Sequence, residues 1–380
     1  MRKSLFRNPR PWMMLFTGIL FAFFLVACGD DTPAQYGPHT ILNTAGPVAD
    51  SERFLFYIIL GIATTIFVIV EGLLIYSIMR YRNRPGMAEP YQNHGNLRVE
   101  VLWTVIPAVI LFVVLGVTIQ GLFQVSTVPA GKSITVRAVG HQWWWEFYYP
   151  DYNITTADSL HAPVGTVVNV QLYSNNVIHS FWIPALTGKT DDIPGHNNTK
   201  WFKADKTGVY YGECAEFCGA QHAHMAFNAV IDTSDNFNTW VTTQQQAAVV
   251  PATGSLEAQG AKIFSGVCTT CHGIVGHGAA GSDKGYITGY QDPKVACDDP
   301  NKACLVGPNL THFAQRNLIA GGVLVHNRDQ CQDPNHLENC NLAKWLANPQ
   351  GIKPGNDMVL GVSLTPTQIK QLVAYLESLN

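Results

Sequence analysis

The chain is 380 residues long; 47% of its residues are hydrophobic and only 13% are charged. This length allows two or three domains, and so low a charged fraction is typical of membrane proteins rather than of soluble enzymes. The formal net charge is −3, so the sequence lacks the basic excess of nucleic-acid-binding proteins and we expect no nucleic-acid partner.

Residues 1–28 have the pattern of a secretory signal peptide, with an apolar run over 14–27 that follows the basic residues Arg2, Lys3, Arg7 and Arg10. The segment 25–28 resembles a bacterial lipobox, in which Cys28 becomes the lipidated mature N-terminus. Ordinary cleavage and an uncleaved helix are the alternatives. Residues 29–51 are polar, contain Pro and Gly, and are expected to form an extracytoplasmic tether.

Residues 52–125 contain two apolar stretches, 54–79 and 103–123, each long enough to cross a bilayer. The segment between them carries Arg80, Arg82, Arg84 and Arg98, whereas the outer flanks hold few basic residues. By the positive-inside rule this loop is cytoplasmic. We therefore expect a transmembrane helical hairpin whose N-terminus and C-terminal continuation both face outward.

Residues 126–233 contain short runs of β-forming residues separated by Gly, Pro and Asn turns. The expected strands are 133–139, 167–173, 200–203, 208–212 and 226–232. This pattern predicts an all-β Greek-key sandwich or barrel. A stiff scaffold of this kind suits a loop whose ligand geometry must stay constant.

One loop of this region gathers two thiols, an imidazole and a thioether: Cys214, Cys218, His222 and Met225. Soft sulfur with imidazole selects copper or zinc, and a Met ligand favours copper in a redox role. Two thiolates can bridge two coppers, with His179 as the further nitrogen ligand. A disulfide is an alternative that leaves His222 and Met225 unexplained; a structural zinc site is another, although zinc rarely takes Met.

The pattern C-x-E-x-C-x-x-x-H-x-x-M with an upstream His resembles the binuclear CuA site of subunit II of the haem-copper cytochrome c oxidases. The resemblance implies a cupredoxin-like fold, two copper ions, and a partnership with oxidase subunits I and III. The implied copper ligands are His179, Cys214, the backbone carbonyl of Glu216, Cys218, His222 and Met225. It also implies that the Glu216 side chain reaches a magnesium ion shared with subunit I.

The same resemblance suggests roles for residues outside the loop. Trp143, the first Trp of an aromatic run, corresponds to the family's electron-entry point; packing is the alternative. Glu100 corresponds to the Glu at the mouth of a proton channel of subunit I, or is a carboxylate that stabilises a helix start. Glu71, inside the first span, is expected to be a neutral helix-contact residue, with proton handling as the alternative.

Residues 234–254 are polar and predict a short helix followed by a linker. Residues 255–380 contain C-x-x-C-H, the attachment motif of c-type haem, formed by Cys268, Cys271 and His272. Alone the motif can arise by chance or as half of a zinc site. The rest of the domain resembles class I cytochrome c, because Gly260 and Phe264 stand where its first helix crosses the last, near 372–376.

This second resemblance implies that His272 is the proximal haem ligand, oriented by the carbonyl of Pro308. Met358 is the only Met after Met225 and is the expected sixth ligand. A His–Met pair raises the haem potential and favours electron transfer. The histidines His277, His312, His326 and His336 are the rivals, and we expect all four at the surface.

Four further cysteines lie in two insertions, and four cysteines allow three pairings. We expect local closure, as Cys297–Cys304 and Cys331–Cys340. Disulfides indicate an oxidising compartment outside the cytoplasm.

The expected fold is thus a two-helix transmembrane hairpin, an all-β cupredoxin-like barrel and an all-α cytochrome c domain. Electrons from an external donor (a soluble cytochrome c, another small redox protein or a quinol-oxidising complex) reach the haem, then Trp143, the copper pair and subunit I, which reduces oxygen to water and pumps protons. Asn175 and Asn176 replace the family's frequent acidic residues; a haem donor tethered at about millimolar effective concentration makes charge steering unnecessary.

Three other classes share parts of this pattern. A quinol oxidase subunit II has the membrane hairpin and the β-domain but lacks copper ligands. A copper chaperone uses C-x-x-x-C and a distant His, yet needs neither Met225 nor a haem domain. Nitrous-oxide reductases carry a similar copper domain on a soluble chain.

Overall fold

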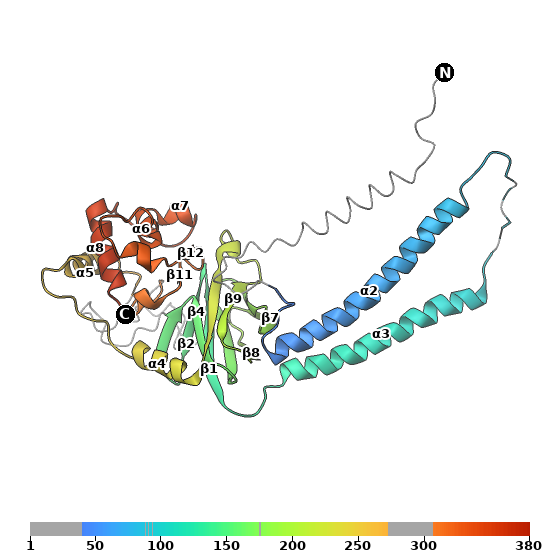
Figure 1. Cartoon of the computed structure of the whole chain (residues 1–380), viewed down its shortest axis with the longest axis horizontal. Helices are drawn as coiled ribbons and strands as arrows, with labels where there is room; N and C mark the ends of the chain where they lie inside the picture. Colours follow the sequence, from blue (N-terminus) through green and yellow to red (C-terminus); the bar gives the residue numbers. More distant parts are fainter. Residues whose placement is uncertain (1–39, 88, 90, 93, 175, 273–306) are drawn as a thin grey trace, which may run out of the picture.

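The computed structural model describes residues 40–380, apart from 88, 90, 93, 175 and 273–306. Figure 1 shows two long helices that extend away from a central β-domain, with the helical C-terminal domain on the other side of it. The expected fold class is confirmed for the described chain. The predictions for the signal peptide, Cys28, His277 and the pair Cys297–Cys304 lie outside the described residues.

The long helices are α2 (Pro47–Arg80) and α3 (Leu97–Ser126). Within the described residues, these are the two helices long and apolar enough to cross a membrane. Helix α2 begins before the expected end of the tether, with Pro at its first position, where the missing N–H costs nothing. Val48 and Ala49 are buried in this first turn, and Val48 packs against Trp201 of the β-domain. Tertiary packing, to which hydropathy is blind, therefore sets the start of the helix.

Two five-stranded sheets form the β-domain, in the orders β3-β2-β1-β5-β8 and β4-β10-β9-β6-β7. The strands are β1 (Ser133–His141), β2 (Trp144–Tyr149), β3 (Ile154–Ala157), β4 (Ser159–Pro163), β5 (Val167–Ser174), β6 (His179–Ile183), β7 (Thr187–Asp192), β8 (Asn198–Lys203), β9 (Gly208–Cys214) and β10 (Ala226–Asp232). Strand β1 pairs in parallel with β5 and antiparallel with β2. The expected strands are present, and five more (β2, β3, β4, β6 and β7) join them.

Aromatic side chains fill the space between the sheets. Trp145, Phe147, Phe181 and Phe227 are fully buried, and the ring centroids of Phe147 and Phe227 are 5.1 Å apart. Large buried rings dominate the energetics of a core. The aromatic run after Trp143 therefore builds the scaffold that holds the metal loop.

Helix α4 (Ser234–Gln244) follows β10 directly and is the short helix that the polar segment 234–254 predicts. Thr233 caps it by accepting from the Asn236 N–H. Its Trp240 stacks on His161, with ring centroids 4.3 Å apart. The helix therefore belongs to the β-domain, and the linker proper begins after it.

The C-terminal domain contains α5 (Leu256–Val267), α6 (Asn341–Ala347), α7 (Pro349–Ile352) and α8 (Pro366–Glu377), with a short hairpin of β11 (Leu318–Ile319) and β12 (Leu324–Val325) and the 3-10 turns η2 (Phe313–Gln315) and η3 (Arg328–Cys331). Helices α5 and α8 cross as expected. A Cβ on Gly260 would lie 2.0 Å from the Gln371 carbonyl oxygen, so glycine is what permits the approach. Phe264 and Tyr375 meet edge to face, with centroids 5.6 Å apart.

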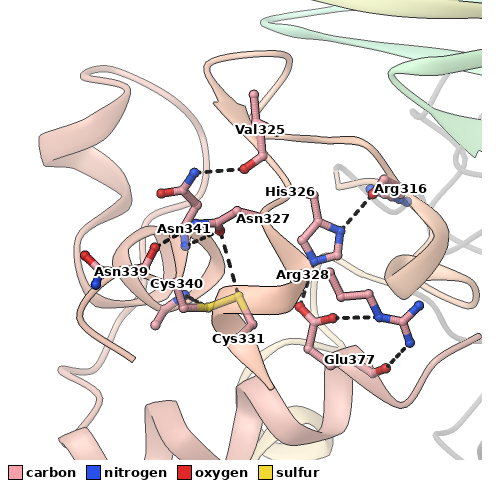
Figure 2. Close-up of a disulfide and its surroundings, with 11 residues drawn as sticks. Arg316, Val325, His326, Asn327, Arg328, Cys331, Asn339, Cys340, Asn341 and Glu377 are labelled. Atoms are coloured by element: carbon pink, nitrogen blue, oxygen red, sulfur yellow. Dashed lines mark hydrogen bonds and ion pairs between the residues drawn. A yellow bond between two sulfur atoms is a disulfide. The ribbon is translucent and has the colours of Figure 1, made fainter. Parts of the chain in front are cut away.

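The disulfide Cys331–Cys340 is confirmed (Figure 2). It joins η3 to the start of α6, and Asn327 accepts from the Asn341 N–H at 2.8 Å beside it. The disulfide therefore closes a loop that a hydrogen bond between Asn327 and Asn341 also stabilises.

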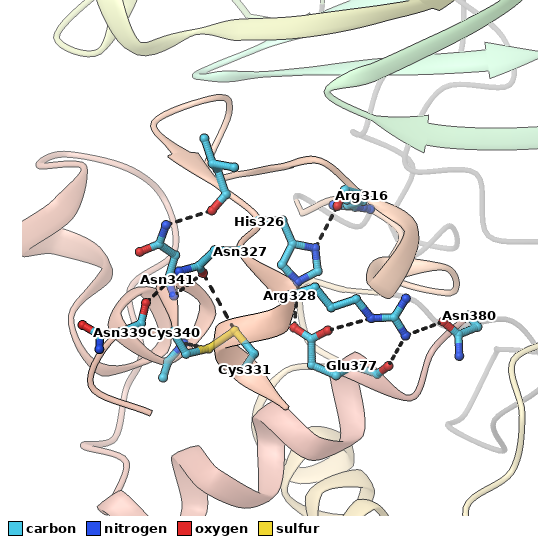
Figure 3. A network of polar contacts seen from close by, with 12 residues as sticks. Arg316, His326, Asn327, Arg328, Cys331, Asn339, Cys340, Asn341, Glu377 and Asn380 are labelled. Carbon is cyan, nitrogen blue, oxygen red and sulfur yellow. Dashed lines mark hydrogen bonds and ion pairs between the residues drawn. A yellow bond between two sulfur atoms is a disulfide. The ribbon is translucent and has the colours of Figure 1, made fainter. Parts of the chain in front are cut away.

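The expectation that the rival histidines lie at the surface is wrong for His312 and His326, each 8% exposed. Figure 3 shows His326 between the Arg316 carbonyl at 2.8 Å and the Glu377 carboxylate at 2.7 Å. His312 Nε2 lies 3.1 Å from the carbonyls of Gln244 and Gln246. Both ring nitrogens of His326 therefore have polar partners, whereas His312 has partners at Nε2 and its buried Nδ1 has none among the described residues. His336 is exposed, as expected.

Candidate functional site

The predicted copper donors gather where β9 ends and β10 begins, with His179 from the start of β6. Cys214 Sγ lies 3.7 Å from Cys218 Sγ and 3.8 Å from His179 Nδ1. Cys218 Sγ lies 3.7 Å from His222 Nδ1 and 3.9 Å from Met225 Sδ. The Glu216 carbonyl oxygen lies 3.2 Å from Cys214 Sγ. All six predicted donors are therefore within one small volume.

The distance between the sulfur atoms of Cys214 and Cys218 distinguishes a metal site from a disulfide. A disulfide needs about 2.05 Å between sulfurs, and both cysteines are free. Ligand atoms of His179, Cys214 and Cys218 lie within 4.8 Å of one another. These residues and Met225 are buried, so the donors form an enclosed, pre-assembled set.

Neighbours fix the orientation of His179. Asn176 Oδ1 lies 2.9 Å from its Nε2, which leaves Nδ1 directed at Cys214. A Cβ on Gly140 would lie 2.7 Å from the imidazole, so strand β1 can pass this close only as glycine. The imidazole of His179 is thus oriented by a hydrogen bond at Nε2 and by the backbone of Gly140, which packs against the ring.

The two thiols influence each other's ionisation. Hydrogen bonding from Cys218 lowers the pKa of Cys214 to about 3, and the same contact raises the pKa of Cys218. Without a cation the pair therefore favours a single negative charge. A bound metal ion deprotonates coordinating thiols outright. Two adjacent thiols with imidazole and thioether donors fit a pair of soft metal ions.

Sequence reasoning overlooked Asp192, whose side chain is fully buried in β7 opposite His179 in the strand register. Burial and the neighbouring Cys214 raise its pKa well above the ordinary value. The segment 190–192 is polar and resembles an exposed turn, so no sequence pattern signals this carboxyl beside the donors.

Trp143 lies against the metal loop. Its indole N–H donates to the Cys218 carbonyl at 3.0 Å, and the Gln142 amide donates to the same oxygen at 2.7 Å. A Cβ on Gly219, which has φ +117°, would lie 3.0 Å from the Trp143 ring. Gln142 is a contact that the motif analysis did not single out.

The predicted haem ligands border one cavity of about 200 Å³. Cys268, Cys271, His272 and Met358 all line it. His272 Nδ1 lies 2.9 Å from the Pro308 carbonyl, the expected orienting contact, so Nε2 remains for a metal. Burial lowers the pKa of His272 to about 4, which keeps the imidazole neutral.

The chemistry of the cavity walls suits a haem. They are largely apolar, with Phe264, Leu310 and Trp345 among them. Both thiols of the attachment motif are free, and Gly307 allows the backbone to approach His272, because a Cβ there would lie 2.6 Å from the ring. The cavity also extends to Trp143 of the β-domain.

The acidic candidates occupy different surroundings. The Glu216 side chain is exposed although its carbonyl faces the thiols. Glu100 accepts from the Asn96 N–H at 3.0 Å while Asn96 caps α3 in return. This reciprocal hydrogen bonding at the helix N-terminus agrees with the alternative expectation for Glu100, a carboxylate that stabilises a helix start. Glu71 is half-buried in α2.

Three family models match the chain in succession. They are the transmembrane domain of cytochrome c oxidase subunit II at residues 34–119, its periplasmic domain at 155–233, and cytochrome c at 257–380. Their order agrees with the hairpin, the β-domain and the helical domain.

Two relatives match this chain over nearly its whole length. Cytochrome c oxidase subunit 2 of Alkalihalophilus pseudofirmus is 32% identical over 350 residues, 90% of each chain. That of Bacillus sp. (strain PS3) is 32% identical over 384 residues, 97% of each chain. The solved periplasmic domain of subunit II of cytochrome oxidase from Bradyrhizobium japonicum is 36% identical, with a TM-score of 0.30, and covers 31% of this chain and 97% of that one. The chain therefore belongs to the cytochrome c oxidase subunit II family, as a membrane-anchored, electron-transferring member with a C-terminal cytochrome c domain.

Proposed function

We propose that electrons enter this subunit at its haem domain, pass by way of Trp143 to a binuclear copper centre, and continue to subunit I. One observation carries the proposal: Trp143 lines the haem cavity and donates its indole N–H to the carbonyl of Cys218. The side chain that borders one redox site is therefore bonded to a ligand residue of the other. When bound, the haem and the copper pair supply one-electron chemistry, one losing the electron that the other gains.

The roles of the chain's own residues follow from their contacts. Cys268 and Cys271 would attach the haem, and His272 and Met358 would hold its iron. The two copper ions are held by His179, Cys214, the Glu216 carbonyl, Cys218, His222 and Met225. Burial of His179, Cys214, Cys218 and Met225 on a stiff β scaffold keeps the geometry of the set nearly constant between oxidation states.

The arrangement in the membrane completes the proposal. By the positive-inside rule, the arginines at this end of the hairpin support a cytoplasmic loop between α2 and α3, with the N-terminus and both redox domains outside. The chain contacts membrane lipid, subunit I and subunit III, and oxygen reduction with proton pumping occurs in subunit I. The exposed Glu216 carboxylate joins a magnesium site at that boundary, and Glu100 lies at a proton-channel mouth. The donor is a soluble cytochrome c, another small redox protein or a quinol-oxidising complex.

Replacing Trp143 tests the route. In the assembled oxidase, Trp143→Phe removes the indole donor, and we expect haem-to-copper transfer to slow by about tenfold while haem reduction by the donor is unchanged. Rapid-reaction spectroscopy of the haem and copper bands measures both steps. Trp144→Phe is the matched control, because Trp144 also lines the cavity but stacks on His141 instead. Copper reduction at the wild-type rate in Trp143→Phe contradicts the route.

A further inference from the structure

A buried lysine joins the two redox domains. Lys353 lies on the loop that leads to Met358 and is 2% exposed. Its ammonium donates to the carbonyls of Trp143 at 2.6 Å, His224 at 2.8 Å and Ala320 at 2.8 Å. An ammonium has three protons to donate, so this group is saturated by two acceptors from the copper domain and one from the haem domain.

The three acceptors are themselves informative. Trp143 contacts the Cys218 carbonyl, and His224 immediately precedes Met225. Lys353 therefore hydrogen-bonds to the backbone of Trp143, the proposed electron-entry residue, and to the backbone of the metal loop at His224. A planar guanidinium fork does not match three acceptors around one point, whereas a compact ammonium does.

Further contacts surround this lysine. The Gln221 amide donates to the Pro354 carbonyl at 2.7 Å, and the Ala226 N–H donates to the Gly321 carbonyl at 3.0 Å. Gly321 has φ +66°, and a Cβ there would lie 2.3 Å from the Trp143 carbonyl oxygen. The haem domain thus meets the copper domain through a glycine turn and directional hydrogen bonds, from side-chain donors to backbone carbonyls and, at Ala226, from backbone to backbone.

Charge also favours the contact. Asp158 of the copper domain is 4% exposed and attracts both Lys353 and Arg316 of the haem domain. A buried ammonium is costly unless it is hydrogen-bonded and electrostatically compensated. The Lys353 site meets both conditions, because three carbonyls accept from it and a buried carboxylate lies near.

We propose that Lys353 is a positioning residue that locks the haem domain onto the copper domain in one register, holding the Met358 loop against Trp143. The two domains then adopt one defined relative orientation instead of the many orientations that the linker alone would allow. The docking itself stands on the contacts above; its importance for electron transfer rests on the proposed function.

The test compares variants of the full-length chain in its oxidase, loaded with haem and copper. Lys353→Met keeps the stem of the side chain and removes the donor. We expect loss of hydrogen-exchange protection at the Ala226 amide, which donates across the interface, and a haem-to-copper rate reduced about tenfold, equivalent to about 1.4 kcal/mol. The haem and copper spectra should keep their wild-type form, because no hydrogen bond joins the Lys353 ammonium to a side chain of either ligand set.

Two further variants keep the result interpretable. Lys344→Met is the matched control, since Lys344 is exposed on α6 of the same domain; it should change neither readout. Gly321→Ala leaves the Lys353 and Met358 side chains unchanged but would place a Cβ 2.3 Å from the Trp143 carbonyl oxygen and 2.5 Å from Lys353 Nζ, so it forces the two domains apart. It decides the matter if Lys353→Met fails to take up haem. It should lower protection and rate together.

Wild-type protection and rate in both interface variants overturn the proposal. So does a slower rate accompanied by altered haem or copper spectra and intact protection, because the lysine then acts on a metal site. The proposed route fails separately, when Trp143→Phe transfers electrons at the wild-type rate; loss of protection in Lys353→Met would still establish the docking.

Discussion

Two glycines of helix α5 should respond in opposite ways to the same substitution. A Cβ on Gly260 would lie 2.0 Å from the Gln371 carbonyl oxygen and 2.7 Å from Tyr375 Cβ. Both are parts of α8 that cannot rotate away, so the two helices must separate. Gly266 is exposed in the same helix, and a Cβ there would meet nothing within 4 Å.

The two effects can be estimated separately. Overpacking costs about 1–3 kcal/mol, and the rigidity of the Gly260 contact places Gly260→Ala near the upper end. Replacing glycine by alanine in a helix returns about 1 kcal/mol. The net for Gly260→Ala is therefore a loss of about 2 kcal/mol, whereas Gly266→Ala should gain roughly 0.5–1 kcal/mol.

Thermal unfolding of the haem-loaded full-length chain, followed at the haem absorption, reports on this domain. At roughly 4 °C per kcal/mol for a domain of this size, Gly260→Ala should lower Tm by about 8 °C and Gly266→Ala should raise it by about 2–4 °C. Equal shifts in the two variants would refute the reasoning that close helix crossing, rather than helix propensity, governs Gly260.

Three further predictions concern the sites and the domain interface. Cys218→Ser removes one of the two proposed thiolate ligands of copper, so metal analysis should find fewer than two coppers per chain and EPR should lose the delocalised two-copper signal; retention of that signal contradicts the binuclear proposal. Met358→Ala removes the proposed second iron ligand, so the haem potential should fall and small exogenous ligands should bind, as redox titration and ligand-difference spectra can test. Burial raises the pKa of Asp158 to about 6 from 3.8, so the folded state holds this proton more tightly than the unfolded chain does. The resulting stability is fully present below about pH 4 and is lost as the pH rises through 6. Asp158→Asn should flatten that dependence in denaturant unfolding, and a slope equal to that of the wild type would contradict it.

Local chemistry made the metal donors and haem motif readable. Cys214, Cys218, His222 and Met225 lie within twelve consecutive residues, and no fold is needed to bring them near one another. His179 is 35 residues from Cys214, and ligand chemistry alone offered it only as a candidate for the further nitrogen ligand. The sheet pairing that places β6 beside β9 supplies the physical reason.

The strands that sequence patterns overlooked share one property. Strand β2 carries the aromatic run, β6 carries the metal His, and β3, β4 and β7 are short or polar. Alternation is the signal that predicts a half-buried strand, and none of these segments shows it cleanly. They form strands because neighbouring strands pair with them, which is a tertiary effect.

The burial of Lys353 and Asp158 likewise could not be predicted from the sequence. Lys353 is 210 residues from the Trp143 carbonyl that it contacts, and a lysine or aspartate in a loop ordinarily lies in water. Nothing in their immediate sequence distinguishes Lys353 and Asp158 from exposed charges. The interface between the two redox domains alone explains why they are buried.

The order of the three parts, the membrane hairpin and the candidate donor atoms could all be predicted from sequence, because hydropathy and ligand chemistry are properties of short segments. Tertiary structure alone decided how His179 reaches the thiols, where α2 starts against Trp201, and how Lys353 joins the two redox domains. Those features depend on contacts between distant segments, whose free energy exists only once the chain has closed upon itself.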